Sequence, residues 1–220
     1  MEIATPAGPA LVELDEPDDP AFLLLSTHAA GGGVRTPDLL AVRAAALGVG
    51  GAVAGVLQPY RVAGRRAPGP APAQDEAWLA VVEALRARFG PLPLVQCGRS
   101  NGARVACRTA LKAEARGVLA LAFPLHPPWN PAASRADELT GAGVEVVVVN
   151  GDRDQFGVPG PELATRVCVL QGEDHSLSRR PARVGELVTE WLERWSAPGR
   201  STPEGPGGGG AWPSGAAPGS

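Results

Sequence analysis

The chain has no excess of charge of either sign and no long apolar run. Its 220 residues include 20 Lys and Arg against 23 Asp and Glu, a formal net charge of -3. So balanced a chain creates no strong field for nucleic acid or an anionic membrane, and we expect neither as a partner. No apolar stretch approaches the length that spans a bilayer, and the first residues, MEIATP, lack a basic segment followed by an apolar one. We therefore expect a cytoplasmic protein.

Residues that commonly bind metals are scarce, with only three cysteines and three histidines in the chain. The three cysteines, Cys97, Cys107 and Cys168, are odd in number and show no C-x-x-C spacing. All three fall in predicted core elements, so we expect reduced buried thiols rather than disulfides or metal ligands. The sequence thus predicts no metal site, and nothing in it calls for a cofactor.

The order of apolar runs predicts one α/β domain over residues 1–196. Strands are expected near residues 10–14, 22–27, 52–58, 94–97, 118–123, 144–150 and 166–170, and helices near 37–48, 74–89, 101–114, 133–141 and 179–195. This alternation is typical of a mostly parallel sheet of about seven strands with helices on both faces, and no insertion is long enough for a large lid. Residues 197–220, rich in Gly, Pro and Ser, are predicted to be a disordered tail.

A serine stands between two glycines directly after one of these strands. Residues 98–102 read GRSNG and fit the pattern G-x-S-x-G. In that pattern a sharp strand-to-helix turn exposes the serine, here Ser100, and Gly98 and Gly102 have no Cβ to crowd it. An ordinary turn serine is the alternative, because a single such pattern in a chain with 29 glycines is weak evidence.

An acid follows the buried strand predicted at residues 144–150. Asp152 and Asp154 compete for this role, and one of them is expected only to form a turn. We favour Asp154 because it lies three residues after Gly151, the offset at which such loops present their acid.

A histidine follows the next strand. His175 lies in the loop after residues 166–170, and the alternative is a loop histidine that caps the helix near Ser178. Because the carboxyl ends of parallel strands meet at one edge of a sheet, we expect Ser100, Asp154 and His175 to converge there.

Small residues follow the strand at 22–27. The segment reads HAAGGG, and an N–H group of Ala29 or Ala30, together with that of Asn101, would form a two-donor oxyanion hole. The alternative is a flexible glycine loop ahead of the helix that starts near Thr36.

Two further segments are expected at the same edge. Residues 60–66, YRVAGRR, form a loop whose arginines would bind an anionic substrate group, although a solvated basic loop is favoured on residue chemistry alone. Residues 123–129, FPLHPPW, would form a rigid wall. The candidate substrate contacts are His28, Tyr60, Arg61, Arg65, His126 and Trp129.

These segments also carry a family resemblance. The matching stretches are THAAGGG at 27–33, QPYRVAGRR at 58–66, GRSNG at 98–102, FPLHPP at 123–128, GDRDQFG at 151–157 and DHSL at 174–177. The chain resembles α/β-hydrolases of the dienelactone-hydrolase-like group, most closely the branch of testis-expressed protein 30 and the third subunit of the non-specific lethal histone acetyltransferase complex. By that resemblance Ser100, Asp154 and His175 fall on triad positions. The chain departs from the family at Ala29, where glycine is usual, and at Asn101, where methionine is common.

The sequence therefore predicts a serine hydrolase that cleaves an ester, thioester or related acyl bond of a small substrate without a cofactor. His175 would take the proton of Ser100, and Asp154 would hold the imidazole and stabilise its cation. A non-catalytic interaction or scaffold protein on the same fold is the alternative. The sequence leaves the oligomeric state open.

Overall fold

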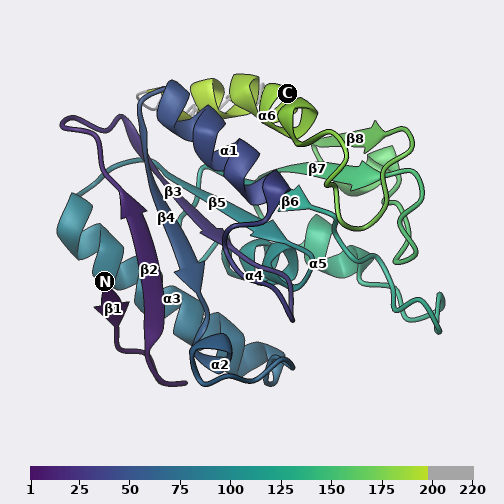
Figure 1. Ribbon diagram of the computed structural model, residues 1–220, viewed down its shortest axis with the longest axis horizontal. Coiled ribbons are helices and arrows are strands. Elements are labelled where there is room, and N and C mark those ends of the chain that lie inside the picture. The colour runs from purple at the N-terminus through teal and green to yellow at the C-terminus, as the bar shows by residue number, and fades with distance from the viewer. Residues whose placement is uncertain (198–220) are drawn as a thin grey trace, which may run out of the picture.

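Continuous apolar runs form the parallel strands of this protein because helices cover both faces of its sheet. The computed structural model describes residues 1–197 and contains one eight-stranded sheet (Figure 1). The strands are β1 (Glu2–Ile3), β2 (Ala10–Asp15), β3 (Phe22–Thr27), β4 (Gly51–Leu57), β5 (Leu94–Arg99), β6 (Gly117–Leu121), β7 (Glu145–Gly151) and β8 (Arg166–Leu170). Their spatial order is β1-β2-β4-β3-β5-β6-β7-β8. β2 pairs antiparallel with both β1 and β4, and the other neighbouring strands, from β4 through β3 and β5 to β8, pair parallel.

Helices cover the sheet in two layers. They are α1 (Pro37–Gly48), α2 (Pro59–Val62), α3 (Ala71–Phe89), α4 (Asn101–Thr109), α5 (Ala136–Thr140) and α6 (Pro181–Ser196), with a 3-10 turn, η1, at Pro161–Leu163. α1 and α6 lie side by side on one face, where Val42 and Val188 share a core cluster with β3 and β7. α3, α4 and α5 pack on the other face. Among the helices of residues 1–197, none is both long and apolar enough to cross a bilayer.

The predicted sheet is confirmed, and the elements differ from the predicted ones chiefly in three places. β1 adds an eighth strand; it has two residues, too few to show a hydrophobic period. α2 occupies the start of the segment predicted as a loop, with Pro59 at its first turn. α4 ends at Thr109 rather than at 114, because the chain turns there and Glu114 adopts a φ of 49° before β6. Residues 198–220, nearly all of the predicted disordered tail, lie outside the described residues.

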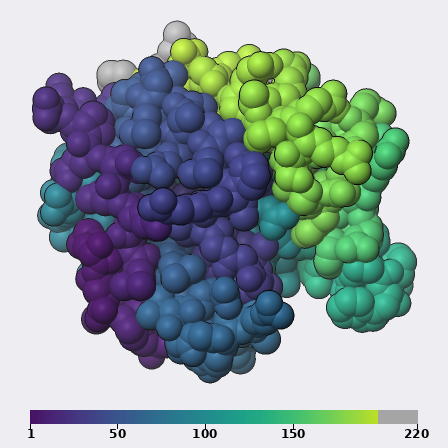
Figure 2. All heavy atoms as spheres, in the orientation of Figure 1, coloured from purple at the N-terminus to yellow at the C-terminus, as the bar shows by residue number. Residues whose placement is uncertain are grey.

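The carboxyl ends of the parallel strands carry the loops that matter for function. β3, β5, β7 and β8 end next to His28, Ser100, Asp152 and Gln171, respectively. The exposed part of the segment between β6 and α5, residues 129–134, projects from the body of the molecule (Figures 1 and 2). No segment within residues 1–197 is inserted as a lid over this edge.

Candidate active site

The turn between β5 and α4 is tight enough to require both of its glycines. Ser100 has φ 52° and ψ -112°, a strained backbone for a residue with a side chain. A Cβ on Gly98 would lie 2.1 Å from the carbonyl carbon of Gly102, and a Cβ on Gly102 would lie 2.7 Å from the carbonyl oxygen of Thr27. The Ser100 N–H donates to the carbonyl of Leu121 at 2.9 Å. β6 therefore helps to hold the serine in this conformation.

Three side chains from separate loops form one hydrogen-bonded chain. His175 Nε2 lies 2.9 Å from Ser100 Oγ, and His175 Nδ1 lies 2.8 Å and 3.0 Å from the two oxygens of Asp154. The buried Asp154 carboxylate also accepts the N–H of Phe156 at 2.9 Å and an amide N–H of Asn150 at 3.1 Å. A carboxylate only accepts, so Nδ1 carries the proton that points to Asp154. Nε2 of the neutral imidazole is then free to accept the Ser100 hydroxyl proton.

The two aspartates that the sequence left in competition occupy different places. Asp152 lies on the surface, where one of its oxygens accepts the N–H of Gly172 at 2.6 Å. This contact ties the turn after β7 to the turn after β8. The structure thus brings Asp154, and not Asp152, against His175.

The loop after β3 brings its backbone close to the serine turn. A Cβ on Gly102 would lie 2.9 Å from the carbonyl oxygen of His28. The N–H groups of Ala29, Ala30 and Asn101 donate to no other residue within 1–197. These three donors, predicted for an oxyanion hole, thus remain available to a ligand.

His28 holds this loop from the inside. Its side chain is fully buried; Nε2 accepts the N–H of Gln58 at 3.0 Å and Nδ1 donates to the carbonyl of Ala29 at 2.8 Å. Burial lowers the pKa of His28 to about 4, so the ring is neutral and both of its nitrogens are used. The ring has no exposed edge or free nitrogen, so its position does not support the predicted contact between His28 and substrate.

α2 supports the same loop from the other side. The Tyr60 hydroxyl, whose pKa burial raises to about 12, donates to the carbonyl of Ala30 at 2.9 Å. The Arg61 guanidinium donates to the carbonyls of Gly32 and Arg65, both at 3.0 Å. Arg61 was a candidate for binding an anionic group, with a solvated loop favoured, and its guanidinium links α2 to the glycine loop. Of the candidate arginine contacts, Arg65 is the one whose side chain stays exposed.

The two candidates from the segment after β6 take separate positions. The His126 ring packs on Gly157, where a Cβ would lie 2.5 Å from Nε2. The His126 N–H also donates to the carbonyl of Phe156 at 3.0 Å, so this residue braces the loop that carries Asp154. Trp129 is 84% exposed in the projecting segment. Within residues 1–197, no hydrogen bond or aromatic ring contact joins the Trp129 side chain to the triad.

Sequence reasoning missed a support behind His175. Arg99, next to the serine, donates from a terminal nitrogen to the His175 carbonyl at 2.8 Å. Its Nε lies 2.9 Å from Oδ2 of Asp38, whose side chain is fully buried at the start of α1. Burial raises the pKa of Asp38, and the Arg99 charge opposes that rise. In the sequence, Asp38 stands only near the start of the helix expected after Thr36, and a partner 61 positions away leaves no local signal.

The arrangement can move a proton from a hydroxyl and present N–H groups to a developing oxyanion. Within residues 1–197 no group of three or more His, Cys, Asp or Glu side chains is placed to hold a metal ion. Cys97 and Cys107 are fully buried, and burial raises the pKa of both thiols. Ser100 is therefore the nucleophile that the geometry favours.

The family model of the alpha/beta hydrolase domain matches residues 20–195, which include the serine turn and the loops that carry Asp154 and His175. The chain belongs to this family. The α/β hydrolase fold predicted from the sequence is thus confirmed. No curated protein sequence matches the chain significantly.

Solved structures share the fold of this α/β hydrolase at low identity. Est1E from Butyrivibrio proteoclasticus has a TM-score of 0.74 and 16% identity, over 90% of this chain and 100% of that one. Dienelactone hydrolase from Anabaena variabilis has a TM-score of 0.71 and 14% identity, over 89% and 96%. XC6422 from Xanthomonas campestris, an α/β serine hydrolase without a lid, has a TM-score of 0.69 and 18% identity, over 92% and 95%. Identities this low establish the fold and leave the activity to be argued from the site.

Proposed function

We propose that this protein is a serine hydrolase that cleaves an ester, thioester or related acyl bond of a small substrate. The observation that carries the proposal is the hydrogen-bonded chain from Asp154 through His175 to Ser100. This series of hydrogen bonds ends at Ser100, which lies in a strained turn with a φ of 52°. Such strain persists where the surrounding structure enforces it, and it is typical of functional sites.

The reaction would proceed in two steps. Ser100 Oγ attacks the substrate carbonyl while His175 Nε2 takes the hydroxyl proton, and the tetrahedral oxyanion receives N–H groups from Asn101 and from Ala29 or Ala30. His175 then gives its proton to the leaving alcohol or thiol as the acyl bond breaks. In the second step His175 takes a proton from water, which attacks the acyl-serine, and His175 returns that proton to Ser100 Oγ as the acid is released. Asp154 stays ionised throughout and stabilises the imidazolium.

The proposal also covers the family branch, the cellular location and the partners of this protein. On the motifs quoted above, we propose that it belongs to the branch of testis-expressed protein 30 and the third subunit of the non-specific lethal complex. We further propose that it is cytoplasmic, that it acts on a small-molecule acyl substrate, and that it needs no cofactor, nucleic acid or membrane partner. Neighbours of the same fold include esterases, and ferulic acid is bound to Est1E in one of those structures. These neighbours support acyl hydrolysis as the class of reaction.

A scaffold function is the second candidate, since the fold alone does not require turnover. A fluorophosphonate probe separates the two, because it reacts covalently with an activated serine. We expect labelling at Ser100 and hydrolysis of para-nitrophenyl acetate. Ser100→Ala should abolish labelling and lower turnover by about 10⁴-fold or more, with the fold intact.

The matched control is Ser134→Ala, which removes an exposed hydroxyl in the projecting segment. This variant should keep both labelling and turnover. If the wild-type protein is not labelled by the probe and hydrolyses no ester of a chromogenic panel, the hydrolase proposal is overturned and the scaffold function is favoured.

A further inference from the structure

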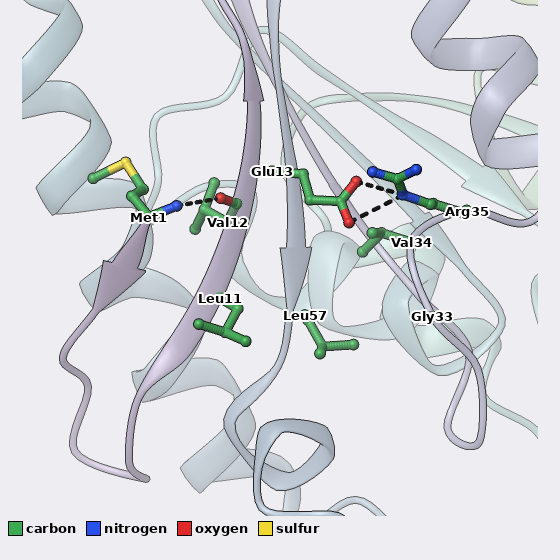
Figure 3. A pocket seen from close by; sticks show the side chains of 8 residues that line it. All are labelled: Met1, Leu11, Val12, Glu13, Gly33, Val34, Arg35 and Leu57. Carbon is green, nitrogen blue, oxygen red and sulfur yellow. Dashed lines mark hydrogen bonds and ion pairs between the residues drawn. The ribbon is translucent and has the colours of Figure 1, made fainter.

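Two hollows lie near the loop after β3, and they differ in their relation to Ser100. The larger, of about 640 Å³, lies over β2 and β4 and is lined by Leu11, Val34 and Leu57, with the Glu13–Arg35 ion pair across it (Figure 3). Its strands lie on the side of the sheet away from β7 and β8, which carry Asp154 and His175. Nothing in the structure shows what would cover it.

The smaller hollow, of about 210 Å³, lies between α2 and the start of α3. Pro59, Tyr60 and Ala77 form its buried base, Ala73 and Gln74 lie at intermediate depth, and Arg65 stands exposed at its rim. We call this hollow the α2–α3 pocket.

Two walls of the α2–α3 pocket are hydrogen-bonded to residues whose backbone N–H groups are candidate oxyanion donors. Gln74 accepts a hydrogen bond from the side-chain amide of Asn101 at 2.8 Å. The Tyr60 hydroxyl donates to the carbonyl of Ala30 at 2.9 Å. The pocket therefore adjoins the place where the carbonyl oxygen of a substrate would sit.

Sheet order then decides which part of a substrate lies on this side. His175 and Asp154 follow β8 and β7, on one side of β5, whereas the α2–α3 pocket is built after β4, on the other side. The leaving group must lie near His175 Nε2, because it takes its proton from that atom. The acyl substituent, on the opposite side of the carbonyl carbon, is directed toward the α2–α3 pocket.

The lining decides the chemistry of that substituent. The side chains of Pro59, Ala73 and Ala77 are apolar, and the Tyr60 hydroxyl is already bonded to the loop. The two amides of the lining are also engaged: Gln58 donates to the Thr27 hydroxyl at 3.1 Å, and Gln74 donates to the carbonyl of Gly69 at 2.6 Å and accepts from Asn101. Arg65 carries a charge, but its exposed guanidinium is solvated, and such a contact adds little to binding. Removing apolar surface from water is therefore the dominant effect here.

We propose that the α2–α3 pocket binds the acyl group of the substrate, and that this group is a short, apolar and uncharged chain. This inference rests on the proposed hydrolase function. The natural substrate class is then an ester or thioester of a short aliphatic acid.

The first test compares para-nitrophenyl esters of increasing acyl length. From acetate to hexanoate, kcat/KM should rise by up to about fourfold for each methylene that is buried. Ala73→Leu fills the pocket and should lower the ratio of kcat/KM for hexanoate over acetate by about tenfold or more. The matched control is Ala87→Leu, the same change at an exposed position of α3, which should leave the ratio as it is. An equal ratio in wild type and Ala73→Leu would overturn the proposal.

A second test checks the charge of the acyl group. The para-nitrophenyl monoester of adipic acid and the para-nitrophenyl ester of heptanoic acid have chains of similar length, and we expect the neutral ester to be the better substrate. A preference for the adipate ester that is lost in Arg65→Gln would replace the uncharged assignment with an anionic one.

A binding measurement separates failure of the pocket from failure of the hydrolase. Ser100→Ala protein should bind ethyl hexanoate in an NMR titration, and adding Ala73→Leu should weaken that binding about tenfold. Binding without hydrolysis by the wild type would overturn the proposed function and keep the pocket. Ser100-dependent hydrolysis with binding insensitive to Ala73→Leu, or no binding at all, would overturn the pocket.

Discussion

The two loops that approach Ser100 are held in place by different kinds of contact. The His175 loop is held by charged groups, because Arg99 donates to its backbone and forms an ion pair with the buried Asp38. The start of the glycine loop after β3 depends on two neutral groups, the imidazole of His28 and the Tyr60 hydroxyl, and the Arg61 guanidinium contacts the loop only further on, at Gly32. The first loop is therefore sensitive to the loss of a charge, and the start of the second to the gain of one.

The His175 side should show the largest effect when its acid is neutralised. Asp154→Asn keeps the shape of the side chain but cannot hold the imidazole in the required tautomer, so turnover should fall on the order of 10⁴-fold. Asp152→Asn should act weakly, because its carboxylate accepts a surface N–H from Gly172. Ester hydrolysis measured on both variants checks this. A larger loss in Asp152→Asn would move the acid to that position.

The buried ion pair behind His175 should contribute the next largest effect. Asp38→Asn leaves the mostly buried Arg99 cation without a counter-charge and should lower the free energy of unfolding by about 3 kcal/mol. Glu13→Gln breaks the Glu13–Arg35 pair, whose side chains are 43% and 71% exposed, and should cost less than about 0.5 kcal/mol. Denaturant unfolding compares the two. An equal loss of unfolding free energy in the two variants would mean that burial does not increase the contribution of the Arg99–Asp38 pair to stability.

The glycine loop should show a smaller effect, and one that depends on pH. The pKa of His28 is lowered from 6.5 to about 4 by burial, so its stabilising contribution is complete above pH 6.5 and is lost as pH falls toward 4. Between pH 7 and pH 5 this single group should remove about 2 kcal/mol from the free energy of unfolding. His28→Gln should remove that part of the pH dependence. In the wild type, NMR signals of the His28 ring that titrate above pH 6 would contradict the assignment.

Local patterns were sufficient to predict the central part of the site. The GRSNG turn requires glycine at two positions because of close contacts within the turn and with the end of β3, and the glycine pattern is visible in the sequence. Asp154 and His175 each follow a buried strand, and parallel strands bring such loops to one edge. Their geometry could therefore be predicted without knowing any side-chain contact.

The supports of the site could not be predicted, because they depend on long-range contacts. Nothing near His28 in the chain indicates that Gln58, thirty positions later, donates to its ring. The same holds for Arg99 and Asp38, which come together only when α1 packs beside the serine turn. Arginines in the segment after β4 suggested an anion site, yet the short helix α2 uses Arg61 as a structural link.

The five-residue turn at 98–102 has consequences for anyone who would redesign this protein. Its glycines are fixed by backbone contacts, and its two nominally variable positions are also occupied: Arg99 reaches α1 and Asn101 reaches α3. A combinatorial library at Arg99 and Asn101 would therefore perturb how two helices seat against the nucleophile, instead of exploring new surface chemistry. Diversity introduced at Ala73, or along the exposed residues 129–134, would change the surface that a ligand or partner contacts and would leave the alignment of the reacting groups unchanged.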